Sequence, residues 1–491
     1  MFDYCRLDDE ESWNLQLRWC KLSHVCRKWR HVIHQPPFHS NIHIPFTNGT
    51  LPSDMLSNLP PLPIVIDFRS WDPASIDPSV LHAILHRDRV RRIVFRAPST
   101  TSEDLIVPMN EPFPILEYLS LSSPPMPKKD TKLVLPQTFL ALNLPQLTSH
   151  GTFLSKGLPL LTSSASLVTL EFADVQTHGY FPPEDLVIQL ENVPRLEELC
   201  VGFSLPNSHP HAKGELFQPP IPLTTVPALR RLEFRGASAS LETLLSRTSA
   251  PLLERFNISL FDELTTLPHL SHFIKTTKGL RHLVANIVLN RRTVMFVVGS
   301  SEQPSLSLHI SSSPFDSLSN SATQICGALV PVLSFVEKLI LRSEEPNFPS
   351  DWQDEVDGIA WHDLLGPFGN VKKLYISHTF APGFSSAMQY DDAELVLGPL
   401  PKLQELEVEL GITQAHITFA GFVNSRQLAG RPVRLSAIRV LPTPLQTDLC
   451  SIWALRKKVG STVVRAYFIL TTSQSGAGPA TVSANIRTTR V

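Results

Sequence analysis

The chain has few cysteines, and none of them form the close pairs that define disulfide-rich or zinc-binding domains. Secreted small domains and zinc modules need clustered cysteines, so their scatter argues against both and favours a reducing compartment. The 491 residues include six cysteines and no C-x-x-C pair: Cys5, Cys20, Cys26, Cys200, Cys326 and Cys450.

Long apolar runs are missing as well. No apolar segment approaches the roughly 18 residues that span a bilayer. The opening stretch, MFDYCRLDDEESW, is acidic and has neither the basic nor the apolar region of a signal peptide. We therefore expect a soluble intracellular protein that works in the cytoplasm, the nucleus or both, without membrane contact.

Neither sign of charge is in excess. The 43 Lys and Arg residues nearly balance the 45 Asp and Glu residues, which gives a formal net charge of −2 at pH 7. A nucleic-acid-binding domain presents a strongly basic face, so we expect no nucleic-acid partner. Basic residues cluster only locally, as in RDRVRR at 87–92, where a solvated helix end explains them at least as well as a phosphate contact.

Enzyme signatures are also missing. The sequence contains no G-x-x-x-x-G-K-[ST] phosphate loop, no G-x-S-x-G elbow, no H-E-x-x-H helix and no dinucleotide-binding glycine fingerprint. We expect no catalytic residues and no cofactor.

Metal ligands are not indicated either. The pairs His31 with His34 and His82 with His86 have one-turn spacing but lack nearby cysteine or acidic ligands, which favours surface histidines. The acidic cluster at 351–357 lacks the glycine turn and closing glutamate of a calcium loop, which favours a solvated loop. We expect no metal site.

Apolar residues and prolines, in contrast, are plentiful. Hydrophobic residues make up 42 % of the chain and charged residues 18 %. A folded protein is therefore expected, and 491 residues are too many for one compact core of the usual size. The 43 prolines are nearly twice the average usage of about 5 %, and they recur before short apolar strands.

One short apolar pattern recurs from the second hundred residues onward. We call it the kernel: apolar-x-x-apolar-x-apolar, usually with Pro or a small residue two places earlier. First positions are separated by 51, 29, 33, 24, 27, 56, 35 and 32 residues. The kernels are Leu116/Leu119/Leu121, Leu167/Leu170/Phe172, Leu196/Leu199/Val201, Leu229/Leu232/Phe234, Leu253/Phe256/Ile258, Leu280/Leu283/Ala285, Val336/Leu339/Leu341, Val371/Leu374/Ile376 and Leu403/Leu406/Val408.

This recurrence is typical of a leucine-rich solenoid, in which each kernel strand buries its apolar side chains against the next coil. The two long intervals contain weaker candidates near 144–147 and 306–308, whereas the serine-rich stretch 299–322 as a whole indicates an interruption. Upstream, a strand at 62–70, a helix at 79–89 and a strand at 91–97 predict a parallel α/β unit. Helices are predicted at 241–247 and 269–275. The alternative is a generic α/β protein with leucine-rich strands.

Near the amino terminus, a second pattern predicts an amphipathic helix. Its apolar residues have offsets of 0, 3, 4, 7 and 11, and its opposite side is basic. An ordinary surface helix is the alternative interpretation. The apolar residues are Leu22, Val25, Cys26, Trp29 and Ile33.

The sequence of this helix, H-V-C-R-x-W-R-x-[IV] followed by a proline turn, resembles the second half of an F-box, as found in the F-box families of mushroom-forming fungi. Further fragments resemble that group in the same order through about residue 435: FDYCRLD, LPIVIDF, DRVRRI, MNEPFPILEYLSL, VPRLEELCVGF, PALRRLEF and RQLAGRPV. The segment that opens an F-box would precede Met1, so the resemblance is to an N-terminally truncated module.

Together, the resemblance and the kernels predict an α/β fold in three parts. The resemblance implies a small all-α F-box-like module at 1–45, and the kernels predict an irregular leucine-rich solenoid with parallel strands and helical or loop connections at 46–435. The kernels and the resemblance both stop near 436, and the chain becomes rich in Ser, Thr, Ala and Gly after 471, so we expect an atypical, partly disordered tail at 436–491. The resemblance also implies that the F-box binds the Skp-type adaptor of a cullin-based ubiquitin ligase, while the solenoid holds a substrate protein. The rival hypothesis is a repeat scaffold without ligase docking.

In this interpretation the five apolar residues of the helix contain the adaptor-binding surface, and Trp29 is the strongest candidate because large aromatic side chains dominate binding hot spots. The sequence does not locate the substrate-binding residues. Exposed positions between kernel residues are only weak candidates: Glu117, Tyr118, Glu197, Glu198, Arg230 and Arg231.

Overall fold

The computed structural model describes residues 44–46, 63–69, 78–96, 105–122, 135–136, 138–150, 159–175, 181–203, 223–261, 267–290, 293–299, 304–311, 317–343, 358–388, 400–409, 412–438, 465–466 and 488–489. The chain divides into two units, Met1–Glu254 and Arg255–Val491.

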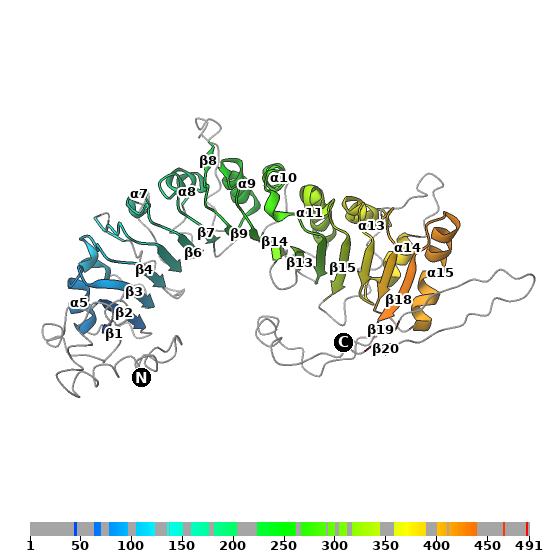
Figure 1. Ribbon diagram of the computed structural model, residues 1–491, viewed down its shortest axis with the longest axis horizontal. Coiled ribbons are helices and arrows are strands. Elements are labelled where there is room, and N and C mark those ends of the chain that lie inside the picture. The colour runs from blue at the N-terminus through cyan, green and yellow to red at the C-terminus, as the bar shows by residue number, and fades with distance from the viewer. Residues whose placement is uncertain are drawn as a thin grey trace, which may run out of the picture. The chain divides into compact units, whose positions relative to one another are not determined.

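The first unit is a parallel sheet whose strands follow one another in chain order. Helices lie on one side of this sheet (Figure 1). The strands are β1 (Ile44–Phe46), β2 (Ile64–Arg69), β3 (Val90–Arg96), β4 (Tyr118–Ser122), β5 (Gln146–His150), β6 (Thr169–Val175), β7 (Glu198–Phe203) and β9 (Arg231–Gly236). Between them come α5 (Pro78–Leu85), η3 (Val107–Met109), α7 (Pro159–Ser163) and α8 (Pro183–Leu190), with α9 (Ser238–Ser246) after β9; β8 (Thr224–Thr225) and β10 (Thr248–Ser249) form a separate parallel pair.

The kernel leucines explain why these strands stack. Side chains alternate between the two faces of a strand, so positions two and three of every kernel point to the same side, toward the helices. The register places the second positions directly opposite one another from strand to strand, and each is at most 1 % exposed. This row consists of Ile66, Ile93, Leu119, Leu147, Leu170, Leu199 and Leu232.

A repeated hydrogen bond joins the coils just before each strand begins. The carbonyl of Val168 accepts the backbone N–H groups of Glu197 at 2.8 Å and Glu198 at 3.0 Å. The carbonyl of Glu197 in turn accepts those of Arg230 and Arg231, at 2.8 and 2.9 Å. Because each coil supplies the acceptor for the next, the strands enter the sheet in a fixed register.

The second unit contains a sheet in the order β11–β14–β13–β12–β15–β16–β17–β18–β19–β20. Helices again lie on one side of it (Figure 1). The strands are β11 (Arg255–Leu260), β12 (Val284–Leu289), β13 (Thr293–Gly299), β14 (Pro304–Ser311), β15 (Lys338–Ser343), β16 (Lys373–Ile376), β17 (Glu405–Val408), β18 (Arg434–Ile438), β19 (Arg465–Ala466) and β20 (Thr488–Thr489). The helices are α10 (Pro268–Thr276), η6 (Lys278–Leu280), α11 (Ser317–Leu333), α13 (Gly358–Leu365), η7 (Gly366–Phe368), α14 (Ala381–Ala387) and α15 (Ile412–Leu428).

Strand β13 interrupts the parallel order of the second unit. It lies between β12 and β14 and runs antiparallel to both, whereas β11 pairs with β14 and β12 with β15 in parallel. The sequence pattern did not predict this strand. The serine-rich stretch 299–322 is not a simple interruption either, because it contains β14 and the start of α11.

One predicted kernel is framed two residues too early. Leu283, expected at a buried second position, is 58 % exposed, while Ala285 pairs with Leu339 of the next kernel and is buried. The carbonyl of Leu283 accepts the N–H groups of Glu337 and Lys338, which is the turn role that Glu197 has in the first unit. The turn at η6 buries Leu280 and shifts the strand, so Ala285 and Ile287 fill the kernel positions.

Most other predicted elements are confirmed. The strands at 62–70 and 91–97 are β2 and β3, which pair in parallel, and the weaker candidates near 144–147 and 306–308 lie in or next to β5 and β14. The helices at 241–247 and 269–275 are α9 and α10, whereas the helix predicted at 79–89 ends at Leu85. Strand β18 continues to Ile438, past the expected end of the repeats at 435. The predicted helical module at 1–45 lies outside the described residues, apart from 44–45, which belong to β1.

Within the described part of the chain, no helix has the length and apolarity that crossing a membrane requires.

Two neighbouring leucines test whether the first kernel position is buried. Leu253, the first position of a kernel, is 1 % exposed, whereas Leu252 is 53 % exposed. We expect Leu253→Ala to lower the free energy of unfolding by about 2–5 kcal/mol, because it leaves a cavity between coils. Leu252→Ala, the matched control, should change it by no more than about 0.5 kcal/mol. Urea unfolding followed by circular dichroism measures both; equal losses would contradict the assignment of the kernel.

Candidate interaction surface

The adaptor-binding residues predicted from the sequence lie outside the residues that the structure describes. Their proposed role is therefore unchanged as a hypothesis. They are Leu22, Val25, Cys26, Trp29 and Ile33.

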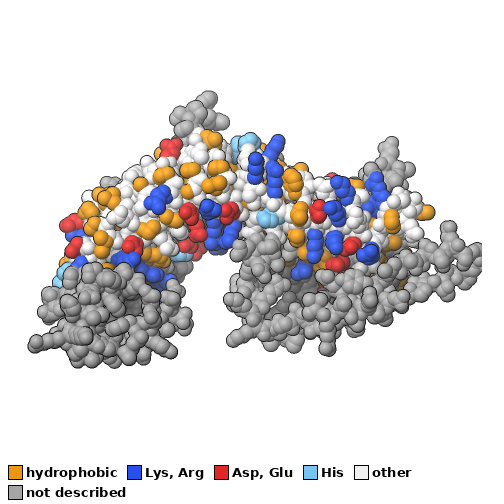
Figure 2. All heavy atoms as spheres, viewed as in Figure 1, with side chains coloured by type: hydrophobic (Ala, Val, Ile, Leu, Met, Phe, Trp, Pro, Cys, Tyr) orange, Lys and Arg blue, Asp and Glu red, His pale blue; other side chains and the backbone are white. Residues whose placement is uncertain are grey.

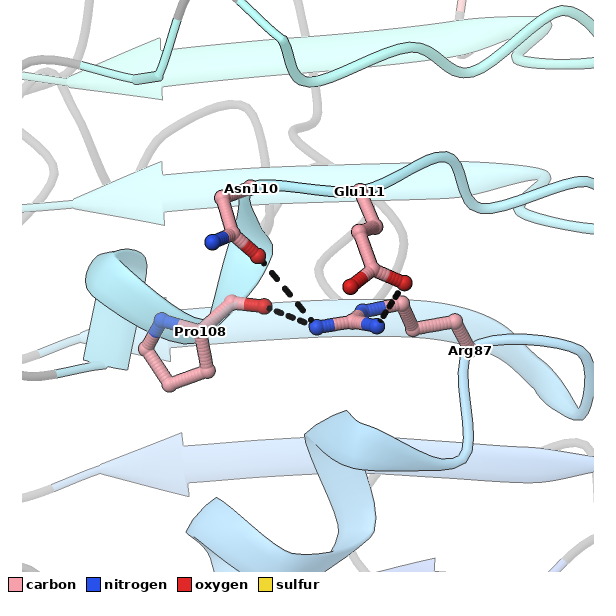
Figure 3. Close-up of polar contacts among 4 residues, drawn as sticks. All are labelled: Arg87, Pro108, Asn110 and Glu111. Carbon is pink, nitrogen blue, oxygen red and sulfur yellow. Dashed lines mark hydrogen bonds and ion pairs between the residues drawn. The ribbon is translucent and has the colours of Figure 1, made fainter.

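The arginine run at 87–92 makes contacts within the chain. Arg87, in the turn after α5, forms an ion pair with Glu111 and donates to the carbonyl of Pro108 at 3.0 Å and to Oδ1 of Asn110 at 3.3 Å (Figure 3). One guanidinium thus joins one coil to the residues at the end of η3 in the next. Arg87 is therefore a link between two coils and not simply the solvated helix end that the sequence suggested.

The same run supplies two more contacts between coils. Arg91 Nε donates to Glu117 Oε2 at 2.7 Å, and the guanidinium carbon of Arg92 lies 4.2 Å from the centre of the Tyr118 ring. Of the weak substrate candidates, Glu117 and Tyr118 therefore already have partners in the preceding coil.

Within the described part of the chain, His82 and His86 have no third ligand of the kind a metal site needs. The rings of His82 and His86 are 5.2 Å apart, centre to centre. Burial, followed by the charge of His82, lowers the pKa of His86. Among the described residues, no group of three or more His, Cys, Asp or Glu side chains could hold a metal ion. The acidic cluster at 351–357 lies outside them.

The strand face of the first unit is the side of its sheet opposite the helices. Its central row lies between the kernel positions and runs through Asp67, Val94, Ser120, Thr148, Glu171, Cys200 and Glu233. The first four side chains are 3–6 % exposed, whereas the last three are only half-buried. The accessible part of this row therefore lies over β6, β7 and β9.

Charged side chains line this accessible part. Glu171 lies 3.5 Å from Nε2 of His150, and Glu233 lies 3.2 Å from Arg231. Figure 2 shows acidic and basic side chains side by side over β7 and β9. An exposed ion pair such as that of Arg231 with Glu233 contributes only about 0–1 kcal/mol, so a partner can exchange it at little cost.

The remaining weak candidates separate into two places. Glu198 and Arg231 are direct neighbours on the strand face. The row they belong to begins at Tyr118 and passes through Gln146 and Thr169 before it reaches Glu198. Glu197 and Arg230 lie in the turns before the strands, where Arg230 pairs with Glu254 at 2.6 Å. Of the six weak candidates, only the three that begin a strand (Tyr118, Glu198 and Arg231) therefore lie on the strand face.

The thiol of Cys200 is a poor nucleophile at neutral pH. Burial, followed by the charges of Glu233 and Glu171 on the neighbouring strands, raises its pKa to about 12. Since the thiolate is the reactive form, this position suits packing better than chemistry. Burial also raises the pKa of Cys326, which lies inside α11.

The strand face of the second unit has a charge pattern that changes from strand to strand. On β15 the outward side chains are Lys338, Ile340 and Arg342; on β16 they are Lys373 and Tyr375; on and just after β17 they are Glu405, Glu407 and Glu409. Lys373 pairs with Glu405 at 2.7 Å. Figure 2 shows basic and acidic side chains together in this region.

Tyr375 is at the centre of this pattern. The guanidinium carbon of Arg342 lies 5.1 Å from its ring centre, and its hydroxyl donates to Oε2 of Glu409 at 3.3 Å. Nδ1 of His378 lies 3.9 Å from the same carboxylate oxygen. Sequence reasoning missed this cluster, although the alternation of charged and apolar residues in KLILRS and ELEVE was a signal that the structure bears out.

Comparisons with known proteins give one match to report. No family model matches the chain, and no curated protein matches it. The leucine-rich repeat-containing protein LegL7 from Legionella pneumophila is similar in structure at 11 % identity, with 79 % of this chain and 98 % of that chain covered and a TM-score of 0.26. The assignment of the fold rests on the strand pairing and burial described above.

The Tyr375 cluster predicts a late tyrosine titration. Burial, followed by the charge of Glu409, raises the pKa of Tyr375 to about 12, whereas the pKa of a tyrosine in the unfolded chain is about 10. The unfolded chain therefore loses this proton first, and the phenol's contribution to stability, complete below pH ~10, is lost as the pH rises toward ~12.

Spectrophotometric titration of the native protein and of Tyr375→Phe isolates this phenol as the difference between the two curves. We expect the difference to develop near pH 12. A difference curve with its midpoint near pH 10 would contradict the shift.

Proposed function

We propose that this chain is a protein-interaction scaffold whose strand faces hold a protein partner, and that it recruits this partner to a ubiquitin ligase. One observation carries the first part. In each unit the helices lie on one side of the sheet, while the other side presents rows of half-buried charged and aromatic side chains on a fixed backbone. Such a surface suits recognition of another protein, because its spacing is set before binding.

Binding rather than catalysis is the proposed role. The thiol of Cys200 has a raised pKa, and Glu171 and Glu233 lie beside the imidazole of His150 and the guanidinium of Arg231. A catalytic nucleophile needs a pKa near neutral pH, and this thiol does not have one. No metal or cofactor is required for the proposed role.

The ligase part of the proposal rests on the F-box resemblance at 22–33. In this hypothesis the Skp-type adaptor binds the apolar side of that helix, the cullin scaffold binds the adaptor, and the repeats hold the substrate. The working compartment would be the cytoplasm, the nucleus or both. The rival is a scaffold that binds its partner through the strand faces without ligase docking, which the same rows of side chains support equally well.

Adaptor binding separates the two hypotheses. We expect the chain to co-purify with a Skp-type adaptor and Trp29→Ala to weaken this co-purification at least about tenfold, as loss of an aromatic hot spot does. Trp13→Ala, outside the F-box-like run, is the matched control. Helical content measured by far-ultraviolet circular dichroism shows whether the Trp29 variant is folded. Undiminished binding by a folded Trp29 variant would refute the role of this residue, and no adaptor binding by the native chain would favour the rival.

Photo-crosslinking tests the strand face directly. We expect p-benzoylphenylalanine at the position of Glu198, exposed on β7, to give adducts with a bound protein in an extract of the source cells. The same residue at the position of Ala239, exposed on α9, should give none. Adducts from the helix position alone would place the binding surface on the other side.

A further inference from the structure

Strand β15 presents a spaced set of side chains on the strand face of the second unit. Leu339 and Leu341 point inward and are at most 1 % exposed, so Lys338, Ile340 and Arg342 point outward. Alternate residues of a strand are about 6.6 Å apart. The outward side of β15 therefore presents a cation, an aliphatic side chain and a second cation at equal spacing.

The two cations differ from their neighbours in having no acidic partner. On the strands that follow β15 in the sheet, Lys373 of β16 pairs with Glu405 at 2.7 Å, and Arg434 of β18 lies 3.6 Å from the same carboxylate. Within the part of the chain that the structure describes, neither Lys338 nor Arg342 forms an ion pair. Arg342 instead stacks on the ring of Tyr375, a contact that orients the guanidinium and does not neutralise it.

On the side of β12 and β13, the polar Asn286 is the direct neighbour of Ile340, and apolar side chains lie beyond and beside it. In register with Ile340 are Asn286 and, beyond it, Val297; in register with Arg342 are Val288 and Met295. Met295 and Val297 are half-buried. An apolar centre with methionine, tyrosine and arginine around it has the composition of the core of a protein interface.

We propose that the face centred on β15 binds an extended acidic segment of a partner protein. This proposal rests on the proposed binding role of the strand face. That segment carries an apolar residue between two carboxylates at alternate positions. In an extended chain such residues have the same spacing as Lys338, Ile340 and Arg342, so each carboxylate meets a cation while the apolar side chain covers Ile340. Charge complementarity selects this partner over a basic or neutral one.

A peptide array tests the proposal with the full-length chain. The probes are surface-linked peptides Gly-Glu-Ser-Leu-Ser-Glu-Gly, the amide version with Gln in place of both Glu, and a basic version with Lys in their place. We expect the native chain to retain the acidic peptide at least about tenfold better than the amide peptide, which corresponds to about 1.4 kcal/mol. The double variant Lys338→Ala/Arg342→Ala should lose this preference.

The matched control is Lys275→Ala/Lys278→Ala, which removes two exposed cations from the helix side of the same unit. It should retain the preference, and unfolding midpoints establish that both double variants are folded. Equal weakening by the two double variants would overturn the proposal, because net charge would then explain binding.

Retention of the basic or amide peptide that depends on Lys338 and Arg342 would overturn the acidic partner but leave the strand face as a binding surface. Absence of all retention would overturn the proposal for β15. The proposed function as a whole fails only if crosslinking from the Glu198 position also fails.

Discussion

No single coil of this chain can bury its own apolar side chains, and the rest of the structure follows from that constraint. A kernel strand has its leucines on one side only, so it is stable only when a neighbouring strand continues the row and a helix covers it. The inward rows fill with leucine, isoleucine and phenylalanine, most of them fully buried. The charged side chains of the strand rows lie on the opposite side of the sheet, as those of Glu171, Glu233, Lys338 and Arg342 do.

That confinement creates the recognition surface. Along a strand the outward positions are about 6.6 Å apart, and between strands the spacing is about 4.8 Å, so outward side chains form a grid. The inward rows must stay apolar, whereas each outward position is free to vary. In the first unit the accessible grid contains Glu171 and Glu233, and in the second unit β15 presents Lys338 and Arg342. The two faces therefore suit different partners or different parts of one partner.

The sequence predicted the strands better than the face they form. Kernels are visible because burial demands apolar residues at fixed spacing, and most of them lie where expected. The kernel at 280–285 was misplaced because Leu283 resembles a core residue more than Ala285 does, while backbone register decides which is buried.

Other features leave no comparable pattern. Strand β13 was not predicted because an antiparallel strand needs neither the proline nor the first kernel position. The cluster around Tyr375 depends on residues from separate coils, and only the register brings Arg342 and Glu409 to the same ring. Whether Trp29 contacts an adaptor is decided outside the described residues, so that hypothesis still depends on resemblance.

The antiparallel strand also gives the second unit an order of assembly. Pairing β12 with β13 closes a loop of a few residues, as does pairing β13 with β14. Pairing β11 with β14, or β12 with β15, requires closure over tens of residues, which is slower and costs more chain entropy. Short loop closure therefore favours early pairing of the three-stranded meander over pairing of the parallel strands beside it. A solenoid of uniform parallel repeats would have no such preferred starting point.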